Sequence, residues 1–300
     1  MSGARARLIY LGYKDGAAVL RVLPSPVGRA LAGGLGLVAW AMGRRRRAVV
    51  AANLRRVLGP GATPAALRRT VRRAFVSYAM YWANAARLDA SDPAVLGRRV
   101  TVVHPERFLD AAARGRGLVV VLPHVGCWEA GAVWTASVGY PLTSVGEELE
   151  PPELFDWFVE IRKRAELTVL RPGGTTPARL LADLRDGRGV ALVADRDVIG
   201  GGQPTTFFGA ATPVPAGPAV LALRTGAAVV PVAIYLEPRG RFTVSLFPEL
   251  DTTRTGDFRA DVARLTRDMV ASFEVMIRAR PEQWHIFQPQ WPDDEVAPNR

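Results

Sequence analysis

The sequence has a single cysteine, three histidines and only two lysines among its 300 residues. One cysteine excludes an internal disulfide framework and a cysteine-rich metal cluster, and it agrees with a reducing compartment. At the N-terminus no compact apolar segment precedes a cleavage site of small residues, so no signal peptide is expected. No Gly-x-Ser-x-Gly motif occurs, which argues against a serine hydrolase of the α/β type.

Acidic residues are missing from a long N-terminal stretch. Residues 16–88 contain 13 arginines and neither Asp nor Glu, whereas the whole chain carries a net charge of only +11. The longest uncharged run of this stretch, residues 30–43, has 14 residues and is shorter than the roughly 20 that span a bilayer. A basic and moderately apolar segment favours a position at a membrane interface. A core helix followed by a solvated arginine cluster is the alternative.

A helix is expected over residues 63–88, with an apolar stripe on one side and a basic face on the other. The stripe repeats every three or four residues and consists of Leu67, Val71, Phe75, Tyr78 and Trp82. The basic face consists of Arg68, Arg69, Arg72 and Arg73. Because no acidic residue lies among them, we predict that these arginines contact an anionic membrane; a merely solvated charged face is the alternative.

From residue 115 onward, strand-like and helix-like segments alternate. This order predicts an α/β fold with a mostly parallel central sheet flanked by helices, and ligands that gather at the carboxyl ends of the strands. We divide the chain into a basic, helical, membrane-associating region (residues 1–90) and an α/β core (residues 91–300), packed together as one domain.

One histidine follows a buried strand in the segment LPHVGCWE. His124 and Glu129 can meet only if the chain turns between them, which Pro123 and Gly126 allow. Glu129 then accepts a hydrogen bond from one imidazole nitrogen and leaves the other as a general base. Cys127 is the nearest nucleophile, but a free cysteine at such a place is usually inert core. We therefore expect the attacking hydroxyl to belong to the substrate.

A second polar cluster ends another strand. Asp195, Arg196 and Asp197 precede a glycine-rich loop, and such groups at a strand's end are typical of a ligand site. A salt-bridged loop without a ligand is the alternative. The remaining histidines, His104 and His285, are expected to be structural.

Taken in order, five segments resemble one family: NLRRVLG, LVVVLPHVGCWE, ADRDVIGGG, FFGAATPVPAGPAVLALRTGAAVVPV and PEQWHIF. The family is that of the bacterial membrane acyltransferases, which includes the lipid A lauroyl and myristoyl acyltransferases and the phosphatidylinositol mannoside acyltransferases. The resemblance covers residues 44–290, and the lack of a clear N-terminal transmembrane helix favours the mannoside branch. It implies a glycerolipid-acyltransferase-like fold and transfer of an acyl chain from a carrier thioester to a hydroxyl of a membrane glycolipid.

The resemblance also implies roles for individual residues. The catalytic pair is His124 and Glu129. The residues expected to bind substrate are Glu147, Arg162, Arg196 and Asp197, and Glu148 fits the first of these positions as well. Trp128, Phe207 and Phe208 are expected to receive the acyl chain. We expect no metal and no permanently bound cofactor, since acyl-CoA or an acyl carrier protein supplies the acyl group as a substrate.

The expected partners are an anionic phospholipid membrane, a glycolipid acceptor and an acyl-CoA donor, without nucleic acid. We expect a monomer, peripheral or monotopic, on the cytoplasmic face of the plasma membrane. A phosphatidylinositol mannoside is the expected acceptor, and a lipid A-type or lysophospholipid acyltransferase is the nearest alternative. Two more distant classes also fit parts of the sequence: a hydrolase that uses the same pair on water, and a non-enzymatic protein that binds membranes or nucleic acid.

Overall fold

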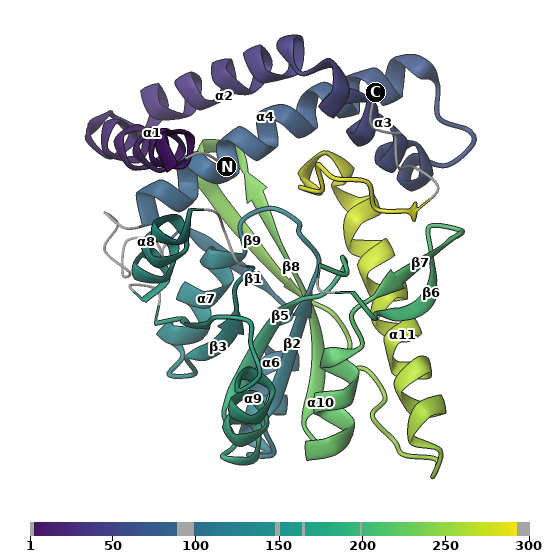
Figure 1. Ribbon diagram of the computed structural model, residues 1–300. Coiled ribbons are helices and arrows are strands. Elements are labelled where there is room, and N and C mark those ends of the chain that lie inside the picture. The colour runs from purple at the N-terminus through teal and green to yellow at the C-terminus, as the bar shows by residue number, and fades with distance from the viewer. Residues whose placement is uncertain (1–2, 89–98, 148–150, 164–165, 199, 293–300) are drawn as a thin grey trace.

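A mostly parallel β-sheet forms the centre of the fold (Figure 1). The structure is a computed structural model that describes residues 3–88, 99–147, 151–163, 166–198 and 200–292. Within these residues seven strands form the sheet in the order β1-β9-β8-β2-β5-β3-β4, and every neighbouring pair is parallel except β8 with β9. The strands are β1 (Val100–Val103), β2 (Leu118–Leu122), β3 (Leu142–Val145), β4 (Thr168–Leu170), β5 (Gly189–Val193), β8 (Ala228–Glu237) and β9 (Arg241–Leu246). The expected fold class is confirmed.

Helices cover both faces of the sheet (Figure 1). One face packs against α6 (Glu106–Ala113), α7 (Trp128–Ser137) and α8 (Pro152–Lys163). The other packs against α9 (Thr176–Arg185), α10 (Gly217–Thr225) and α11 (Phe258–Ala279). Along β2, Leu118, Val120 and Leu122 join the first core, while Val119 and Val121 join the second. All five side chains are buried, as an apolar run in the middle of a parallel sheet predicts.

Two parts of the fold differ from what the sequence predicts. The strand β1 and the helix α6 lie in a segment for which we predict no element. The glycine-rich stretch, expected to be irregular, leads into a hairpin of β6 (Gln203–Phe207) and β7 (Ala210–Val214). Its two turn residues, Phe208 and Gly209, both have positive φ, as a two-residue hairpin turn of type I′ requires. The sequence does not indicate this turn, because an aromatic residue stands at its first position, where Asn, Asp or Gly is usual.

Four N-terminal helices lie across one end of the sheet, at the top of Figure 1. They are α1 (Gly3–Val22), α2 (Ser25–Met42), α3 (Arg44–Leu58) and α4 (Pro64–Leu88). A Cβ atom at Gly36 of α2 would lie 2.8 Å from the carbonyl oxygen of Phe75, so glycine is what lets α2 pack closely on α4. The apolar stripe predicted for α4 turns inward, with Val71 and Phe75 fully buried.

The N-terminal helices share the core of the sheet. Leu54 and Phe75 pack in the cluster on one face, and Tyr81 and Ala85 pack in the cluster on the other. In the described part of the chain, no helix is both long and apolar enough to cross a bilayer. The predicted boundary between residues 90 and 91 lies outside the described residues.

Candidate active site

The candidate site lies where β2 and β5 end. These strands are parallel neighbours, with Leu122 opposite Val193. The residues that follow the two strands therefore leave the sheet side by side, which places His124 next to Asp195.

The chain bends sharply between His124 and α7, as predicted. Gly126 has φ +66°, and a Cβ atom at this position would overlap the carbonyl oxygen of Ile234 in β8. The bend is fixed from both sides, because the Gly126 amide donates to the carbonyl oxygen of Gln283 at 3.0 Å and the Cys127 amide donates to Ile234 at 3.1 Å. A residue with a side chain cannot replace Gly126 without moving β8.

Asp195 holds the imidazole of His124. Its Oδ1 lies 2.5 Å from His124 Nδ1, and its Oδ2 accepts the His124 amide at 3.0 Å and Trp284 Nε1 at 2.7 Å. The Asp195 side chain is fully buried, which by itself would raise the pKa of its carboxyl group. The charge of a protonated His124 and the hydrogen bonds from His124 and Trp284 outweigh burial and lower that pKa. A carboxylate that stays ionised next to Nδ1 leaves Nε2 as the nitrogen that can take a proton.

Among the described residues no hydrogen bond or ion pair joins Glu129 to His124, and Asp195 occupies the place at the imidazole that we predict for Glu129. Its Oε1 accepts the Tyr81 hydroxyl at 3.1 Å and an Arg162 guanidinium N–H at 3.2 Å. Its Oε2 lies 3.6 Å from the Cys127 thiol. Glu129 lies in the first turn of α7 and is buried, and these contacts hold it in the core. Its catalytic role stays a prediction.

The ionisable groups around Glu129 form a buried cluster, and they shift one another's pKa values. Burial and the Glu129 charge raise the pKa of Tyr81 well above its usual range. Burial would lower the pKa of Arg162, but the charges of Glu129 and Tyr81 outweigh it and raise that pKa. Burial and Glu129 also raise the pKa of Cys127, so its thiol stays protonated and is a poor nucleophile. This agrees with the expected inert role of the cysteine.

The remaining predicted substrate-binding residues have partners of their own. Arg196 donates to both oxygens of Glu147, at 3.0 and 2.9 Å. Asp197 accepts the amides of Gly200 and Gly202 at 3.0 and 2.8 Å and so shapes the glycine loop. The alternative acid, residue 148, lies outside the described residues.

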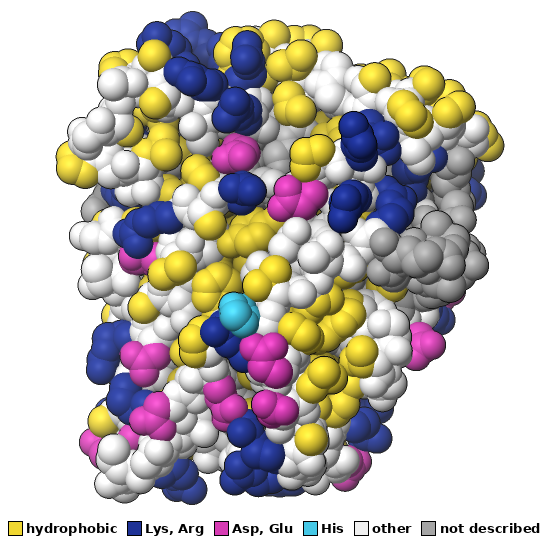
Figure 2. All heavy atoms as spheres, turned by 180° about the vertical axis from the view of Figure 1, so that it is seen from behind, with side chains coloured by type: hydrophobic (Ala, Val, Ile, Leu, Met, Phe, Trp, Pro, Cys, Tyr) yellow, Lys and Arg dark blue, Asp and Glu magenta, His cyan; other side chains and the backbone are white. Residues whose placement is uncertain are grey.

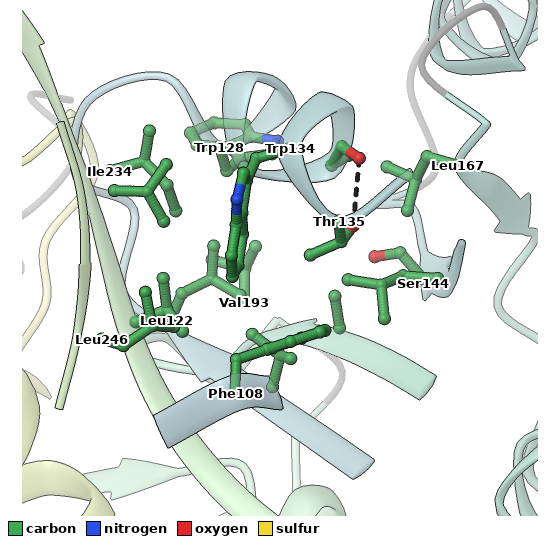
Figure 3. A pocket seen from close by; sticks show the side chains of 17 residues that line it. Phe108, Leu122, Trp128, Trp134, Thr135, Ser144, Leu167, Val193, Ile234 and Leu246 are labelled. Carbon is green, nitrogen blue, oxygen red and sulfur yellow. Dashed lines mark hydrogen bonds between the residues drawn. The ribbon is translucent and has the colours of Figure 1, made fainter. Parts of the chain in front are cut away.

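An apolar cavity lies between α6, α7 and the sheet (Figure 3). Its empty space, with the open solvent at its mouth included, is about 500 Å³. Side chains of α6, α7 and the strands line it, among them Phe108, Leu122, Trp128, Trp134, Val193 and Ile234. The Trp128 ring belongs to this lining and also meets the His124 ring edge-to-face, with 5.7 Å between centroids.

Phe207 and Phe208 do not line this cavity. Their rings pack against Trp284, with centroid distances of 6.0 and 6.1 Å. They belong to the core on the opposite face of the sheet. Trp128 is the predicted pocket residue that the cavity does contain.

The remaining histidines differ in their surroundings. His285 is buried, with Nε2 3.0 Å from the Ser77 hydroxyl and its amide donating to the His124 carbonyl oxygen at 2.8 Å. Burial and the charge of His124 lower the pKa of His285 to about 3. His104 is exposed and lies 3.1 Å from Glu106. Both therefore fit structural positions. In the described residues no group of three or more His, Cys, Asp or Glu side chains could hold a metal ion.

The N-terminal helices present basic and apolar side chains together. The four predicted membrane-contacting arginines of α4 are exposed. Large apolar side chains of α1 and α2 are exposed as well, including Val19, Val22, Val27, Leu31, Leu35 and Met42. Figure 2 shows hydrophobic and basic side chains mixed across the top of the molecule, over these helices. An exposed apolar patch of this kind marks an interaction surface.

Comparison with known proteins identifies the class of enzyme. Residues 5–293 match the family model described as bacterial lipid A biosynthesis acyltransferase. The chain belongs to this family and is an O-acyltransferase.

Two relatives have a more specific name. The chain is 37% identical over 286 residues to the phosphatidylinositol mannoside acyltransferase of Mycolicibacterium smegmatis, covering 94% of this chain and 90% of the relative. It is 37% identical over 246 residues to the protein of the same name in Mycobacterium tuberculosis H37Rv, covering 80% of this chain and 75% of the relative. The resemblance to the bacterial membrane acyltransferases, which we infer from the five sequence segments, is confirmed.

Proposed function

We propose that this protein transfers a fatty acyl chain from an acyl thioester to a hydroxyl group of a membrane glycolipid, with a phosphatidylinositol mannoside as acceptor. The names of its relatives support the acceptor class. The single observation that supports the reaction is the position of His124. Its imidazole is held by a buried carboxylate at Nδ1 and stands beside an apolar cavity that shares Trp128 with it.

The reaction follows from the proton positions. With Nδ1–H donated to Asp195, Nε2 of His124 removes the proton of the acceptor hydroxyl as that oxygen attacks the thioester carbonyl. A carbon–oxygen bond forms and a tetrahedral oxyanion results. When the oxyanion collapses, the carbon–sulfur bond breaks, and the imidazolium returns its proton to the departing thiolate. No acyl group is attached to the enzyme, which agrees with the protonated and buried Cys127.

The cavity beside Trp128 is the proposed place of the acyl chain. Its lining is almost entirely hydrocarbon, and burial of each methylene group there is worth about 0.8 kcal/mol. This energy would be available to hold the thioester carbonyl near His124 during the reaction.

Arg162 and Arg196 are proposed to bind the polar parts of the substrates, together with Glu147 and Asp197. Each of the two arginines has a buried Nε without a hydrogen-bond partner among the described residues. A buried N–H without a partner is costly, and a phosphate or sugar oxygen would satisfy it. The donor is proposed to be acyl-CoA or an acyl carrier protein.

The mixed basic and apolar surface of α1, α2 and α4 is the proposed membrane-binding surface. Arginines near an anionic membrane contribute about 1 kcal/mol each, and the exposed apolar side chains would insert among the lipid headgroups. We propose that the enzyme works as a monomer on the cytoplasmic face of the plasma membrane.

The test uses purified protein with radiolabelled palmitoyl-CoA and liposomes that contain phosphatidylinositol mannoside. His124→Gln should abolish formation of the acylated glycolipid, and the exposed His104→Gln variant should leave it unchanged. Normal turnover by His124→Gln would refute the mechanism. Free fatty acid as the sole product of the unmodified enzyme would instead support a hydrolase.

A further inference from the structure

Three half-buried arginines lie together where the N-terminal helices meet the turn between β8 and β9 (Figure 1). Arg29 belongs to α2 and Arg87 to the end of α4, and Arg99 directly precedes β1. We propose that this arginine cluster binds a phosphate group, that of the headgroup of an anionic phospholipid which is neither acyl donor nor acceptor. The inference goes beyond the proposed function, because it concerns a lipid that the reaction leaves unchanged.

Two glycines leave room for the guanidinium groups. In the turn after β8, Gly240 has φ +69°, and a Cβ atom there would overlap the Arg99 guanidinium and lie 3.4 Å from Nη1 of Arg29. In α2, a Cβ atom at Gly28 would lie 2.7 Å from Nη1 of Arg87. The Arg29 and Arg99 side chains therefore meet at one point of the backbone, and Arg87 reaches the residue just before Arg29.

The three arginines differ in how many of their hydrogen-bond donors the protein uses. Arg87 is engaged at the turn between α1 and α2, where it donates to two backbone carbonyl oxygens and one hydroxyl at distances between 2.6 and 3.1 Å. Arg99 donates to the carbonyl oxygen of Gly240. Arg29 has no hydrogen bond or ion pair within the described part of the chain. Because a guanidinium has five N–H donors, Arg29 and Arg99 keep several of them for a ligand.

Neither Arg29 nor Arg99 has a carboxylate partner among the described residues. Residues 16–88, which include α2 and α4, contain no acidic residue, and Glu237 at the end of β8 lies 3.9 Å from Arg280. Burial and the charges of Arg29 and Arg87 lower the pKa of Arg99. Partial burial weakens the screening by water, so the like charges repel one another. A bound phosphate would offset this repulsion, and its oxygens match the planar fork of a guanidinium.

The position of the cluster favours a lipid headgroup over a soluble phosphate. Val27 and Leu31 are exposed on α2, four residues apart and therefore on one side of the helix. Arg29 lies midway between them in the sequence and so on the opposite side. An amphipathic helix at a membrane lies with its apolar side about 5–10 Å deep in the headgroup region. Its opposite side, with Arg29, is then at the level of the lipid phosphates.

The cluster is separate from the candidate active site. Ile234 of β8 meets the bend at Gly126, and β8 continues to Glu237 before the turn that contains Gly240. At about 3.3 Å per residue, this continuation of the strand places the turn about 10 Å beyond the bend. A lipid held at the turn would fix the enzyme on the membrane without occupying the place of either substrate.

Binding of a short-chain lipid tests the proposal. The probe is dihexanoylphosphatidylglycerol below its micelle concentration, and isothermal titration calorimetry gives the Kd. The unmodified protein should bind it saturably, and Arg29→Gln should weaken binding at least about tenfold, as expected for loss of a charged hydrogen bond. Without lipid, Arg29→Gln should unfold at the same temperature as the unmodified protein or higher, because it loses no internal hydrogen bond and relieves the repulsion.

Arg239→Gln is the matched control. It removes an exposed arginine of the same turn, next to Gly240, and changes the net charge equally. Its Kd should stay within about twofold of the unmodified value, whereas Arg99→Gln should resemble Arg29→Gln. An equal loss in Arg239→Gln would show that the surface charge of the turn, and not the cluster, attracts the lipid.

Inorganic phosphate and CoA are the soluble sources of the same group. If either binds as tightly as the lipid and loses its affinity in Arg29→Gln, the assignment to a lipid is wrong. Absence of saturable lipid binding, or undiminished binding by Arg29→Gln, would overturn the proposal altogether. His124→Gln should bind the lipid normally, and the lipid titration contains no acyl donor. A failure of the proposed reaction would therefore leave this result unchanged.

Discussion

Nε1 of Trp284 lies 2.7 Å from Oδ2 of Asp195, although 89 residues separate the two in the chain. The same short turn places the carbonyl oxygen of Gln283 on the amide of Gly126 at 3.0 Å. One segment after α11 therefore supports both halves of the site, the loop after β2 and the residues after β5. The aromatic motif PEQWHIF lies in this segment and supports the site. After its glutamate it has no charged side chain that could bind a substrate.

The first prediction concerns Gly126. Gly126→Ala should destabilise the protein by more than about 3 kcal/mol, because it combines a positive φ with an overlap with Ile234. Glycolipid acylation should be lost as well. The free energy of unfolding, measured by urea denaturation, checks the first statement.

Gly139→Ala is the matched control. Gly139 also has positive φ, +78°, but a Cβ atom there would meet nothing within 4 Å. Its substitution should cost about 1 kcal/mol and leave activity unchanged. Equal losses of stability in both variants would show that the contact with β8 is unimportant.

The second prediction concerns the apolar cavity. Ala132 of α7 is buried and lines it. Ala132→Leu fills part of the space and should lower kcat/KM for palmitoyl-CoA about tenfold, since overpacking by a few carbon atoms costs about 1–3 kcal/mol. Octanoyl-CoA, which needs less of the cavity, should be affected less.

The control for this variant is Val138→Leu, which adds bulk at an exposed position just after α7. Both acyl donors should react with it as with the unmodified enzyme. A uniform loss with both donors in Ala132→Leu would mean that the cavity does not hold the acyl chain.

Much of the fold can be predicted from local patterns in the sequence. The apolar stripe of α4, the buried run of β2 and the bend at Gly126 each depend on residues that are near one another in the chain. The partner of His124 depends on which strands are neighbours. Glu129 is nearer in sequence, but the pairing of β2 with β5 brings Asp195 to the imidazole.

The rule that ligands gather at the carboxyl ends of parallel strands could have indicated Asp195, which follows β5 closely. Trp284, Gln290 and Tyr81 could not be assigned in this way, because their contacts cross between segments without a regular spacing. The position of Phe207 and Phe208 outside the cavity that contains Trp128 could not be predicted for the same reason. Their hydrophobicity is evident in the sequence, but the side of the sheet on which they pack is not.

The third prediction concerns the membrane. Replacing four arginines of α4 with glutamine should weaken binding to anionic liposomes at least tenfold and reduce its salt dependence, since each contributes up to about 1 kcal/mol. These are Arg68, Arg69, Arg72 and Arg73. Sedimentation with liposomes of increasing phosphatidylglycerol content measures this.

A control with the same change of net charge comes from exposed arginines elsewhere. They are Arg185, Arg254, Arg259 and Arg267. Their replacement should change binding much less. If the two sets of substitutions weaken binding equally, net charge rather than the face of α4 determines it.

The fourth prediction concerns the pH dependence of stability. The pKa of His285 is lowered from 6.5 to about 3, by burial and by the charge of His124. Between these pH values the unfolded chain binds a proton that the native protein does not, so stability falls as pH falls below about 6.5. The contribution is about 1.4 kcal/mol per pH unit between about pH 5.5 and about pH 4.

Urea denaturation of the unmodified protein and of His285→Asn across this pH range tests the prediction. The variant should be less stable at about pH 7 because it loses packing, but its stability should fall less steeply with acid. Parallel pH dependences would show that His285 takes up a proton in the native state.

The contacts that build the base also determine when in folding it can appear. They join residues 71, 89 and 237 positions apart in the chain. Contacts of such long range form late, because each requires closure of a long loop. A partly folded chain therefore has the histidine but lacks the buried carboxylate and the indole that direct it. Such a partly folded chain would therefore not react with acyl thioesters. The appearance of activity during refolding would mark the completion of the whole fold.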